Sequence, residues 1–414
     1  MKVWVINPYG NIPGEGWRTY RTTLIANAFV ANGHQVVSWV SNIQHRSKEK
    51  RAETWKDIQV NPNYLIKIVP STGYSGHISF ARIKYERTYA KNLCAKALET
   101  NEKPDLIILG EPALFIFDII KKLVKQKEAA LIIDVIDLWP ELFNILLPNR
   151  LDFLGKFIFA PLYYRRNLLF KKADGIMAVA RDYLQIGLNA KPMVPGAVVY
   201  WGLNVEEVKV PVGHDYQKKE LNSLEKKDGE VWLVYAGTLG SNYDIDTLLQ
   251  CGLLLAKRNV GVKLLIAGDG PLKERVEQFI ATEKLTNVVY LGSLLPQDLN
   301  LLYTKCDIAL SSYVLHSTVS MPIKAYDYLA AGLPLVNSLG RDLGSFVSER
   351  QVGIQYQPEN AEAMFAAVLQ LVNDQALRLQ MKTNALVLAD EFDAVKQYQK
   401  AVVLAEKVLQ INQH

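Results

Sequence analysis

Met321-Pro-Ile-Lys-Ala-Tyr-Asp-Tyr-Leu-Ala-Ala-Gly-Leu-Pro-Leu-Val336 joins a short helix to a buried strand. Pro322 suits the start of a helix, because the N–H that it lacks would have no partner inside the helix there. Gly332 and Pro334 are typical of the end of a helix, and the apolar pair Leu335-Val336 follows as a strand. A helix that leads directly into a continuous apolar strand is typical of a parallel α/β sheet.

The same alternation of apolar strand and amphipathic helix extends along almost the whole chain. Strands are predicted at residues 3–7, 35–40, 106–110, 131–137, 175–180, 231–236, 263–267, 288–291, 308–311, 335–337 and 353–356. Helices are predicted at residues 17–32, 244–257, 271–283 and 361–372, among others. We therefore expect an α/β fold whose parallel sheets are covered on both faces.

The alternation stops once, over the polar residues 206–230, and this stretch marks the predicted domain boundary. A chain of 414 residues has room for two large domains. We expect two doubly wound, Rossmann-like domains, residues 1–205 and 206–393. A further helix is predicted within residues 394–414, and the pattern alone does not fix which domain it packs on.

Composition limits the classes of partner and compartment. The net charge of +5 is mildly basic, which fits anionic ligands and is too weak and dispersed for a nucleic-acid partner. The three cysteines are isolated and lack metal-ligand spacing, so we expect a reducing compartment and no metal. The absence of a signal peptide pattern and of a long apolar run predicts a cytoplasmic protein.

In doubly wound folds, ligands bind at loops that follow the strands. The loop 8–16 carries Gly14 and Gly16, which would let backbone amides approach phosphate oxygens at the start of the next helix. Its glycine spacing differs from the dinucleotide fingerprint. The alternative is a loop whose glycines serve only to turn the chain.

The second half has a comparable set of loops. Gly237, Thr238 and Gly240 follow a predicted strand and can supply amide and hydroxyl donors to a diphosphate. Gly268 lies in a tight turn after the next strand, and the backbone near Leu294 is placed to hydrogen-bond a base edge.

Lys324 and Asp327 lie one turn apart on the helix of the opening stretch. A cation in the first turn is unfavourable by about 0.3–1 kcal/mol, because the helix dipole is positive at that end. Its presence makes sense if it and the free helix amides bind a common anion such as a diphosphate. Asp327 would accept hydrogen bonds from a vicinal diol such as a ribose, and together the two residues indicate a nucleotide-sugar site.

Two carboxylates follow strands of the first half. Asp137 could orient or deprotonate an acceptor hydroxyl, and a buried or capping acid ahead of Trp139-Pro140 is the equal alternative. Glu111 is a second candidate for a catalytic acid or base. Asp134 lies inside its strand, and we expect it to be structural.

Five motifs in order resemble a known family: Ala236-Gly-Thr-Leu-Gly, Ile266-Ala-Gly-Asp-Gly-Pro271, Val289-Tyr-Leu-Gly292, Cys306-Asp-Ile-Ala-Leu310 and Lys324-Ala-Tyr-Asp-Tyr-Leu-Ala-Ala-Gly-Leu-Pro334. Together they resemble retaining family-4 glycosyltransferases of the GT-B fold, over nearly the whole chain. Asp137-Leu-Trp-Pro-Glu141 resembles the bacterial surface-polysaccharide branch of that family. The resemblance implies two domains facing across a cleft, with the last helix crossing back onto the first.

The resemblance also implies a reaction. A hexosyl or N-acetylhexosaminyl group would move from a nucleotide diphosphate sugar, UDP-sugar by family precedent, to a hydroxyl of a polyprenyl-linked or glycan acceptor. The second domain would bind the donor and the first the acceptor, without a metal. Lys324, with the amides at Gly16 and Gly237, would neutralise the departing diphosphate. A sugar-nucleotide epimerase on the same plan and an inactive, partner-regulating subunit remain as alternatives.

The chain departs from the family at several positions. Where the family often has two glutamates eight residues apart, this chain has Val319 and Asp327. The arginine and lysine usual after the glycine turn are absent from residues 239–244. Asp137 stands where a histidine is common. These differences leave the contacts of the donor sugar unassigned and keep the inactive subunit open.

Aromatic and basic residues alternate over residues 150–172. Such a mixture suits the interface of an anionic membrane, at about 1 kcal/mol for each cation near the surface. The alternative is a core helix with one solvated basic edge. The hypothesis is a peripheral position at the inner face of the membrane, with these contact residues: Phe157, Arg165, Arg166, Lys171 and Lys172.

Overall fold

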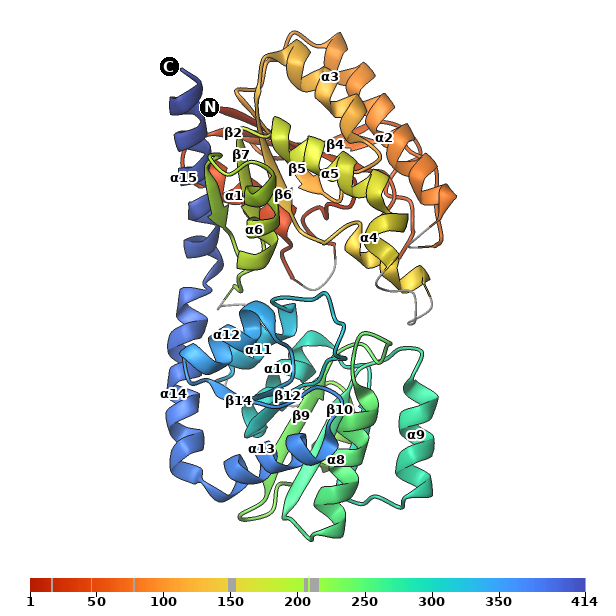
Figure 1. The fold of residues 1–414 in the computed structure, drawn as a ribbon, viewed down its shortest axis with the longest axis vertical. Coiled ribbons are helices and arrows are strands. Elements are labelled where there is room, and N and C mark those ends of the chain that lie inside the picture. Colours follow the sequence, from red (N-terminus) through yellow and green to blue (C-terminus); the bar gives the residue numbers. More distant parts are fainter. Residues whose placement is uncertain are drawn as a thin grey trace. The chain divides into compact units, whose positions relative to one another are not determined.

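The computed structural model describes residues 1–15, 18–45, 47–76, 79–147, 154–204, 208 and 216–413. The chain forms two compact units, Met1–Trp201 with Ala394–His414, and Gly202–Asp393. Each unit is an α/β structure with its own sheet (Figure 1). No helix within the described ranges combines the length and the apolar character needed to cross a membrane.

The first unit is built on an 8-stranded sheet in the order β3-β4-β2-β1-β5-β6-β7-β8. Its strands are β1 (Lys2–Ile6), β2 (Gln35–Ser41), β3 (Lys56–Asn61), β4 (Tyr64–Val69), β5 (Leu106–Glu111), β6 (Ala130–Val135), β7 (Gly175–Ala178) and β8 (Gly196–Val198). All neighbouring pairs are parallel except β3 and β4, which form an antiparallel hairpin.

Helices cover both faces of this sheet. They are α1 (Arg21–Ala31), α2 (Phe80–Glu99), α3 (Phe117–Lys127), α4 (Gly155–Ile158), α5 (Ala160–Lys172), α6 (Arg181–Ala190) and α15 (Ala394–Asn412), with a 3-10 turn η1 (Glu141–Leu146). Alternate residues of each strand point to opposite faces. Val3 and Val5 accordingly pack with α1 and α15, whereas Trp4 and Ile6 pack in a second core with α2 and α3.

The last helix, α15, belongs to the first unit, although it follows the second unit along the chain. It lies against α1 and the strands β6, β7 and β8 (Figure 1). Tyr398, Val402 and Ala405 are fully or almost fully buried in this contact. The apolar face of α15 therefore completes one side of the first sheet.

A buried ion pair joins α1 to the sheet. Arg21 donates to both carboxylate oxygens of Asp134 on β6, at 2.8 and 2.6 Å, and to the carbonyl of Val199 at 2.6 Å. Both charged side chains are 3% exposed. Asp134 therefore has a structural role, as the sequence indicated, and Arg21 is its ion-pair partner.

The second unit has a 6-stranded, fully parallel sheet in the order β11-β10-β9-β12-β13-β14. Its strands are β9 (Val231–Ala236), β10 (Val262–Ala267), β11 (Val288–Gly292), β12 (Ile308–Ser311), β13 (Leu335–Asn337) and β14 (Gly353–Gln355). Its helices are α8 (Ile245–Lys257), α9 (Lys273–Thr282), α10 (Pro296–Lys305), α11 (Ile323–Ala330), α12 (Arg341–Glu349), α13 (Ala361–Asn373) and α14 (Gln375–Glu391), with a 3-10 turn η3 (Lys219–Ser223).

The predicted two-sheet α/β fold is confirmed, with one correction to its parallel character. The hairpin β3–β4 was not among the predicted strands, and its outer strand runs antiparallel. Its residues Lys56–Asn61 are mostly exposed and polar, so they lack the continuous apolar run that identified the buried strands. A strand at the edge of a sheet needs no such run.

Candidate functional site

The candidate donor site of the second unit lies at the carboxyl ends of its central strands. β9 leads into the loop with Gly237, Thr238 and Gly240, and β10 leads into the turn at Gly268. β9 pairs with β10 on one side and β12 on the other, so their carboxyl ends are neighbours. Helix α11 carries Lys324 to the same edge, since its Nζ lies 3.2 Å from where a Cβ on Gly237 would stand.

Lys324 has an unusual environment. Its Nζ lies 4.3, 4.2 and 4.9 Å from the ring centroids of Tyr235, Tyr243 and Tyr313. The Nζ atom is buried, and within the described residues it has no hydrogen-bond partner. The rings offer cation–π attraction but no counter-charge. Burial lowers the pKa of Lys324 to about 7, so an anion brought next to the ammonium would hold its proton in place.

The glycine loops are used differently from the prediction. The amide of Gly237 donates to the carbonyl of Ala267 at 3.0 Å, and that of Gly268 donates to Gly292 at 2.8 Å. Neither amide is therefore available to a diphosphate. Gly268 instead allows close packing, since a Cβ there would lie 1.8 Å from the carbonyl oxygen of Gly237.

The backbone amides of Thr238 and Gly240 remain candidates for the predicted contact with a diphosphate. Thr238 is exposed and Gly240 is partly exposed. Within the described part of the chain, neither backbone amide donates to another protein group. The carbonyl of Thr238 accepts a hydrogen bond of 3.0 Å from the Tyr235 hydroxyl, which ties this loop to the tyrosine that faces Lys324.

Asp327 and Leu294 border the same part of the second unit. Asp327 lies on α11 one turn beyond Lys324 and is 5% exposed. The next residue, Tyr328, binds the end of β9 through hydrogen bonds of its hydroxyl to the amide and carbonyl of Ala236, at 2.8 and 3.2 Å. Leu294 is partly exposed just after β11. Their ribose and base contacts stay predictions.

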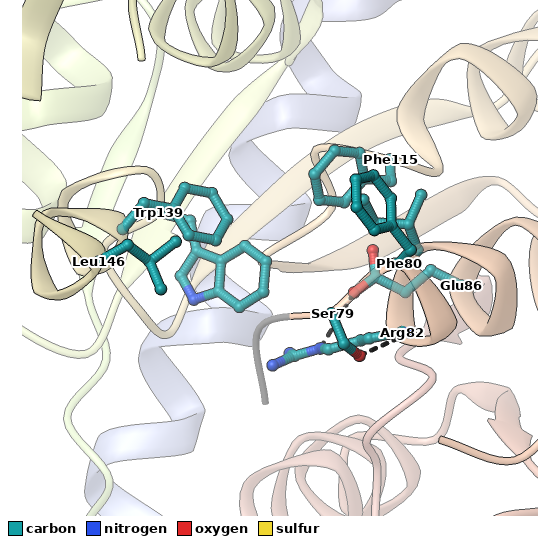
Figure 2. A pocket seen from close by; sticks show the side chains of 9 residues that line it. Ser79, Phe80, Arg82, Glu86, Phe115, Trp139 and Leu146 are labelled. Carbon is teal, nitrogen blue, oxygen red and sulfur yellow. Dashed lines mark hydrogen bonds and ion pairs between the residues drawn. The ribbon is translucent and has the colours of Figure 1, made fainter. Parts of the chain in front are cut away.

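In the first unit, Asp137 follows the end of β6 and is exposed. Burial nevertheless raises the pKa of Asp137, and the nearby Arg82 guanidinium opposes that rise. Arg82, on α2, lies 4.3 Å from the ring centroid of Trp139 (Figure 2). A carboxylate with a raised pKa, open to solvent beside a cation, is suited to exchange a proton with a bound hydroxyl.

Arg82 belongs to a buried cluster that the sequence did not reveal. Its Nε donates to the Tyr9 hydroxyl at 2.8 Å and lies 3.3 Å from Glu86, while Tyr9 donates a short hydrogen bond to Glu86. Burial raises the pKa of Glu86 to about 7. The spacing of Arg82 and Glu86 is a recognisable helical pair, but Tyr9 comes from a distant loop and only the fold brings it there.

Glu111 is not where the prediction placed it. It ends β5 and is 0% exposed, so it does not line a solvent-accessible surface. One carboxyl oxygen accepts a 2.6 Å hydrogen bond from the amide of Ala113, and burial raises its pKa to about 8. It is therefore an internal, mostly protonated acid at neutral pH, because ionising it there would strand a charge away from water.

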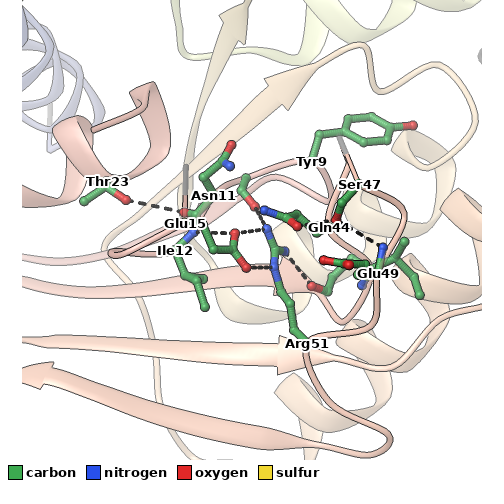
Figure 3. Close-up of polar contacts among 12 residues, drawn as sticks. Tyr9, Asn11, Ile12, Glu15, Thr23, Gln44, Ser47, Glu49 and Arg51 are labelled. Carbon is green, nitrogen blue, oxygen red and sulfur yellow. Dashed lines mark hydrogen bonds and ion pairs between the residues drawn. The ribbon is translucent and has the colours of Figure 1, made fainter. Parts of the chain in front are cut away.

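The first glycine loop is held by an ion pair (Figure 3). Arg51 donates to both carboxylate oxygens of Glu15, at 2.6 and 2.5 Å, and to the carbonyl of Gly10 at 2.9 Å. Gly14 is exposed with φ of +85°, a conformation that favours glycine. Gly16, the second predicted phosphate contact, lies outside the described residues.

The predicted membrane residues divide into two groups. Phe157, Lys171 and Lys172 are exposed, with Phe157 at 79%. Arg166 is 6% exposed, and it binds Glu141 at 2.5 Å and the Trp139 carbonyl at 2.9 Å. The prediction of membrane contact is therefore wrong for Arg166, because its side chain is buried and its charge is paired with Glu141.

Arg165 is intermediate between the two groups, with its side chain 39% exposed. It donates to the carbonyl of Leu114 at 3.0 Å and lies 3.5 Å from Asp118. Part of its charge is therefore used inside the first unit.

Comparisons with known proteins bear on the second unit most directly. Residues 217–387 match the family model for glycosyl transferases group 1. An alpha-monoglucosyldiacylglycerol synthase from Streptococcus pneumoniae is 26% identical over 192 residues, which is 45% of this chain and 42% of that protein. The chain thus matches less than half the length of this curated relative.

Solved structures match over both units. The sucrose-phosphate synthase from Thermosynechococcus elongatus has a TM-score of 0.72 at 13% identity, covering 99% of each chain. Anabaena HepE in complex with UDP-glucose has a TM-score of 0.63 at 13% identity, covering 99% of each chain. Residues 217–387 are therefore a glycosyl transferases group 1 domain, and the chain as a whole has the GT-B fold.

Proposed function

We propose that this protein is a retaining glycosyltransferase that moves a sugar from a UDP-sugar to a hydroxyl of a lipid-linked or polysaccharide-precursor acceptor. The observation that carries the proposal is the Lys324 ammonium, enclosed by three tyrosine rings and without a carboxylate partner in the described residues. A buried cation without a counter-charge is costly, and a bound diphosphate would supply that charge.

The proposed chemistry is stabilisation of a leaving group. The bond from the sugar carbon to the diphosphate oxygen breaks as the acceptor oxygen forms a bond on the same face. The acceptor proton passes to the departing phosphate oxygen, with Asp137 orienting the hydroxyl. Lys324 and the free amides of Thr238 and Gly240 stabilise the charge that develops on the diphosphate. Such preorganised donors commonly contribute a large part of catalysis.

Four further features support parts of the proposal. Anabaena HepE, which shares the fold, was solved with UDP-glucose, and this favours a UDP-sugar donor. The pneumococcal relative is named for a glucosylated diacylglycerol, which favours a hexosyl group and a lipid acceptor. Asp327, one helical turn from Lys324, is the proposed ribose contact. Exposed Phe157, Lys171 and Lys172 fit a peripheral position on an anionic membrane.

The test is a thermal-shift screen of nucleotides and nucleotide sugars, followed by donor hydrolysis and transfer assays. A nucleotide at 100 times its Kd should stabilise the protein by about 2.7 kcal/mol. We expect Lys324→Met to lose nucleotide binding and to lower turnover about 100- to 1,000-fold.

Lys263→Met is the matched control. Lys263 also lies near an aromatic ring, 5.4 Å from the Trp232 centroid, but it has Glu230 as a partner at 3.9 Å. The control should bind nucleotide normally. If no nucleotide stabilises the protein, or if Lys324→Met binds as tightly as the control, the proposal fails.

A further inference from the structure

A pocket in the first unit is not explained by donor binding. Its volume is about 300 Å³, at the lower end of the range for ligand pockets. Nine residues line it: Ser79, Phe80, Arg82, Ile83, Glu86, Phe115, Trp139, Phe143 and Leu146. Figure 2 shows Trp139 and Leu146 on one side, with Phe80 and Phe115 opposite them.

The pocket walls are largely apolar. Phe80 and Ile83 come from the first turn of α2, and Phe143 and Leu146 come from η1. The polar groups at its base already bind each other, since Arg82 is held by Tyr9 and Glu86. A bound molecule would therefore be held mainly by the burial of its hydrocarbon, because the polar side chains of the pocket already have hydrogen-bond partners.

Exposed apolar side chains occur in the pocket lining and on the helix that packs beside η1. Phe80 is 90% exposed and Leu146 is 57% exposed, although both line it. Helix α4, which packs beside η1, adds Phe157 at 79% and Ile158 at 50%. A soluble protein rarely leaves large side chains exposed next to one another without a binding role.

Positive charge lies beside the same wall. Arg87 donates to the carbonyl of Phe115, a lining residue, at 3.3 Å, and Arg165 donates to that of Leu114 at 3.0 Å. Both guanidinium groups share one carboxylate, Asp118, at 3.3 and 3.5 Å. Two half-exposed cations with one counter-charge leave a net positive charge at the edge of the apolar surface.

We propose that this pocket binds the hydrocarbon chain of an anionic membrane lipid, with the anionic group at Arg87 and Arg165. Resting on the proposed function, this lipid is the acceptor. Asp137, the proposed acceptor contact, is two residues before the pocket residue Trp139 in the chain. The net charge selects an anionic amphiphile over an uncharged apolar molecule or an apolar protein segment.

The test uses three probes on the full-length protein: dodecyl phosphate below its aggregation concentration, dodecyl maltoside and inorganic phosphate. Binding is followed by calorimetry and by tryptophan fluorescence, since Trp139 lines the pocket. We expect dodecyl phosphate to bind, dodecyl maltoside to bind more weakly and phosphate alone not to bind measurably. Equal affinity for the two dodecyl compounds, or no binding of dodecyl phosphate, would overturn the proposal.

Variants locate the binding. Phe80→Ser should weaken dodecyl phosphate binding about tenfold, because it removes an aromatic wall. Leu146→Trp should weaken it by filling the pocket. Met193→Ser is the matched control, since Met193 is 94% exposed in the same unit and does not line the pocket. All three sites are exposed, so the variants should fold. Equal affinities for Phe80→Ser and Met193→Ser would overturn the assignment.

The same samples separate this inference from the proposed function. Nucleotide binding without dodecyl phosphate binding overturns the lipid pocket and leaves the glycosyltransferase proposal standing. Dodecyl phosphate binding at the pocket without nucleotide binding supports the pocket and overturns the proposed function.

Discussion

The two units differ in what surrounds their buried cations. In the first unit, four nearly buried arginines each face a carboxylate: Arg21 with Asp134 at 2.6 Å, Arg51 with Glu15 at 2.5 Å, Arg82 with Glu86 at 3.3 Å and Arg166 with Glu141 at 2.5 Å. In the second unit, the Lys324 Nζ faces three tyrosine rings and has no hydrogen-bond partner among the described residues.

The difference separates structural charge from functional charge. A buried ion pair satisfies both partners, so it positions elements and offers little to a ligand. A buried cation without a counter-charge weakens the fold and keeps its attraction for an anion from outside. The comparison therefore predicts that removing a cation has opposite effects on stability in the two units.

The largest effect should come from Arg21→Met. The change leaves the Asp134 carboxylate buried and unpaired, so the free energy of unfolding should fall by about 3–5 kcal/mol. Urea denaturation followed by circular dichroism measures it. The double variant Arg21→Met with Asp134→Leu should recover much of the loss, because no lone charge remains.

Lys103→Met is the control for this prediction. Lys103 and Glu128 form an exposed pair, with side chains 66% and 76% accessible, so its loss should change the urea midpoint very little. A loss in Arg21→Met no greater than in Lys103→Met would contradict the structural role of the buried pair.

The second prediction concerns the pH dependence of Glu86. Its pKa is about 7 in the folded protein, above the ordinary 4.5, so the folded state holds more protons between these values. Wild-type stability should therefore fall relative to Glu86→Gln as the pH rises from 5 to 8, by about 1–3 kcal/mol. Urea titrations of both proteins at each pH measure the difference. A difference that does not change with pH would show that Glu86 stays ionised.

Lys324→Met should stabilise the protein, which is the opposite of the effect expected for Arg21→Met. The folded pKa of Lys324, about 7, lies below the ordinary 10.5, so the unfolded chain holds more protons between pH 7 and 10. The penalty of the buried ammonium is greatest below pH 7, and the variant should be more stable there by about 1–2 kcal/mol. The advantage should shrink as the pH rises towards 10. Lower stability of Lys324→Met at pH 6 would mean that Lys324 has an internal counter-charge.

The sequence predicted those strands whose apolar pattern is visible within a few consecutive residues. β9 and β12 have the predicted bounds, because each is a continuous apolar run. The edge strand β3 was missed because it is mostly exposed and carries polar residues. Its neighbour β4 is mostly buried, but Lys67 interrupts its apolar run, and it was missed as well. Local patterns identify continuous apolar strands well, and polar or interrupted strands poorly.

The candidate site shows the same limit. A cation in the first helical turn singled out Lys324, and the fold places it at the carboxyl edge of β9. The tyrosines around it come from three separate segments, so no spacing in the chain reveals them. Gly237 was predicted to contact the diphosphate and Gly268 to belong to the donor site, but their amides bind neighbouring carbonyls. Sequence identified the loop and could not show which of its amides were free.

The last prediction tests whether the Lys324 charge itself attracts the donor. Bound UDP should raise the pKa of Lys324, so wild-type affinity should fall as the pH rises above about 7, by up to tenfold for each pH unit. Lys324→Arg keeps its charge at these pH values, and its affinity should not show this fall. Calorimetric titration of UDP into both proteins from pH 6 to 9 measures the two slopes. The phosphate of UDP titrates identically in both experiments, so only the difference between slopes belongs to residue 324. Parallel slopes would mean that the ammonium is already charged in the free protein, and the tyrosine rings would then be its sufficient partners.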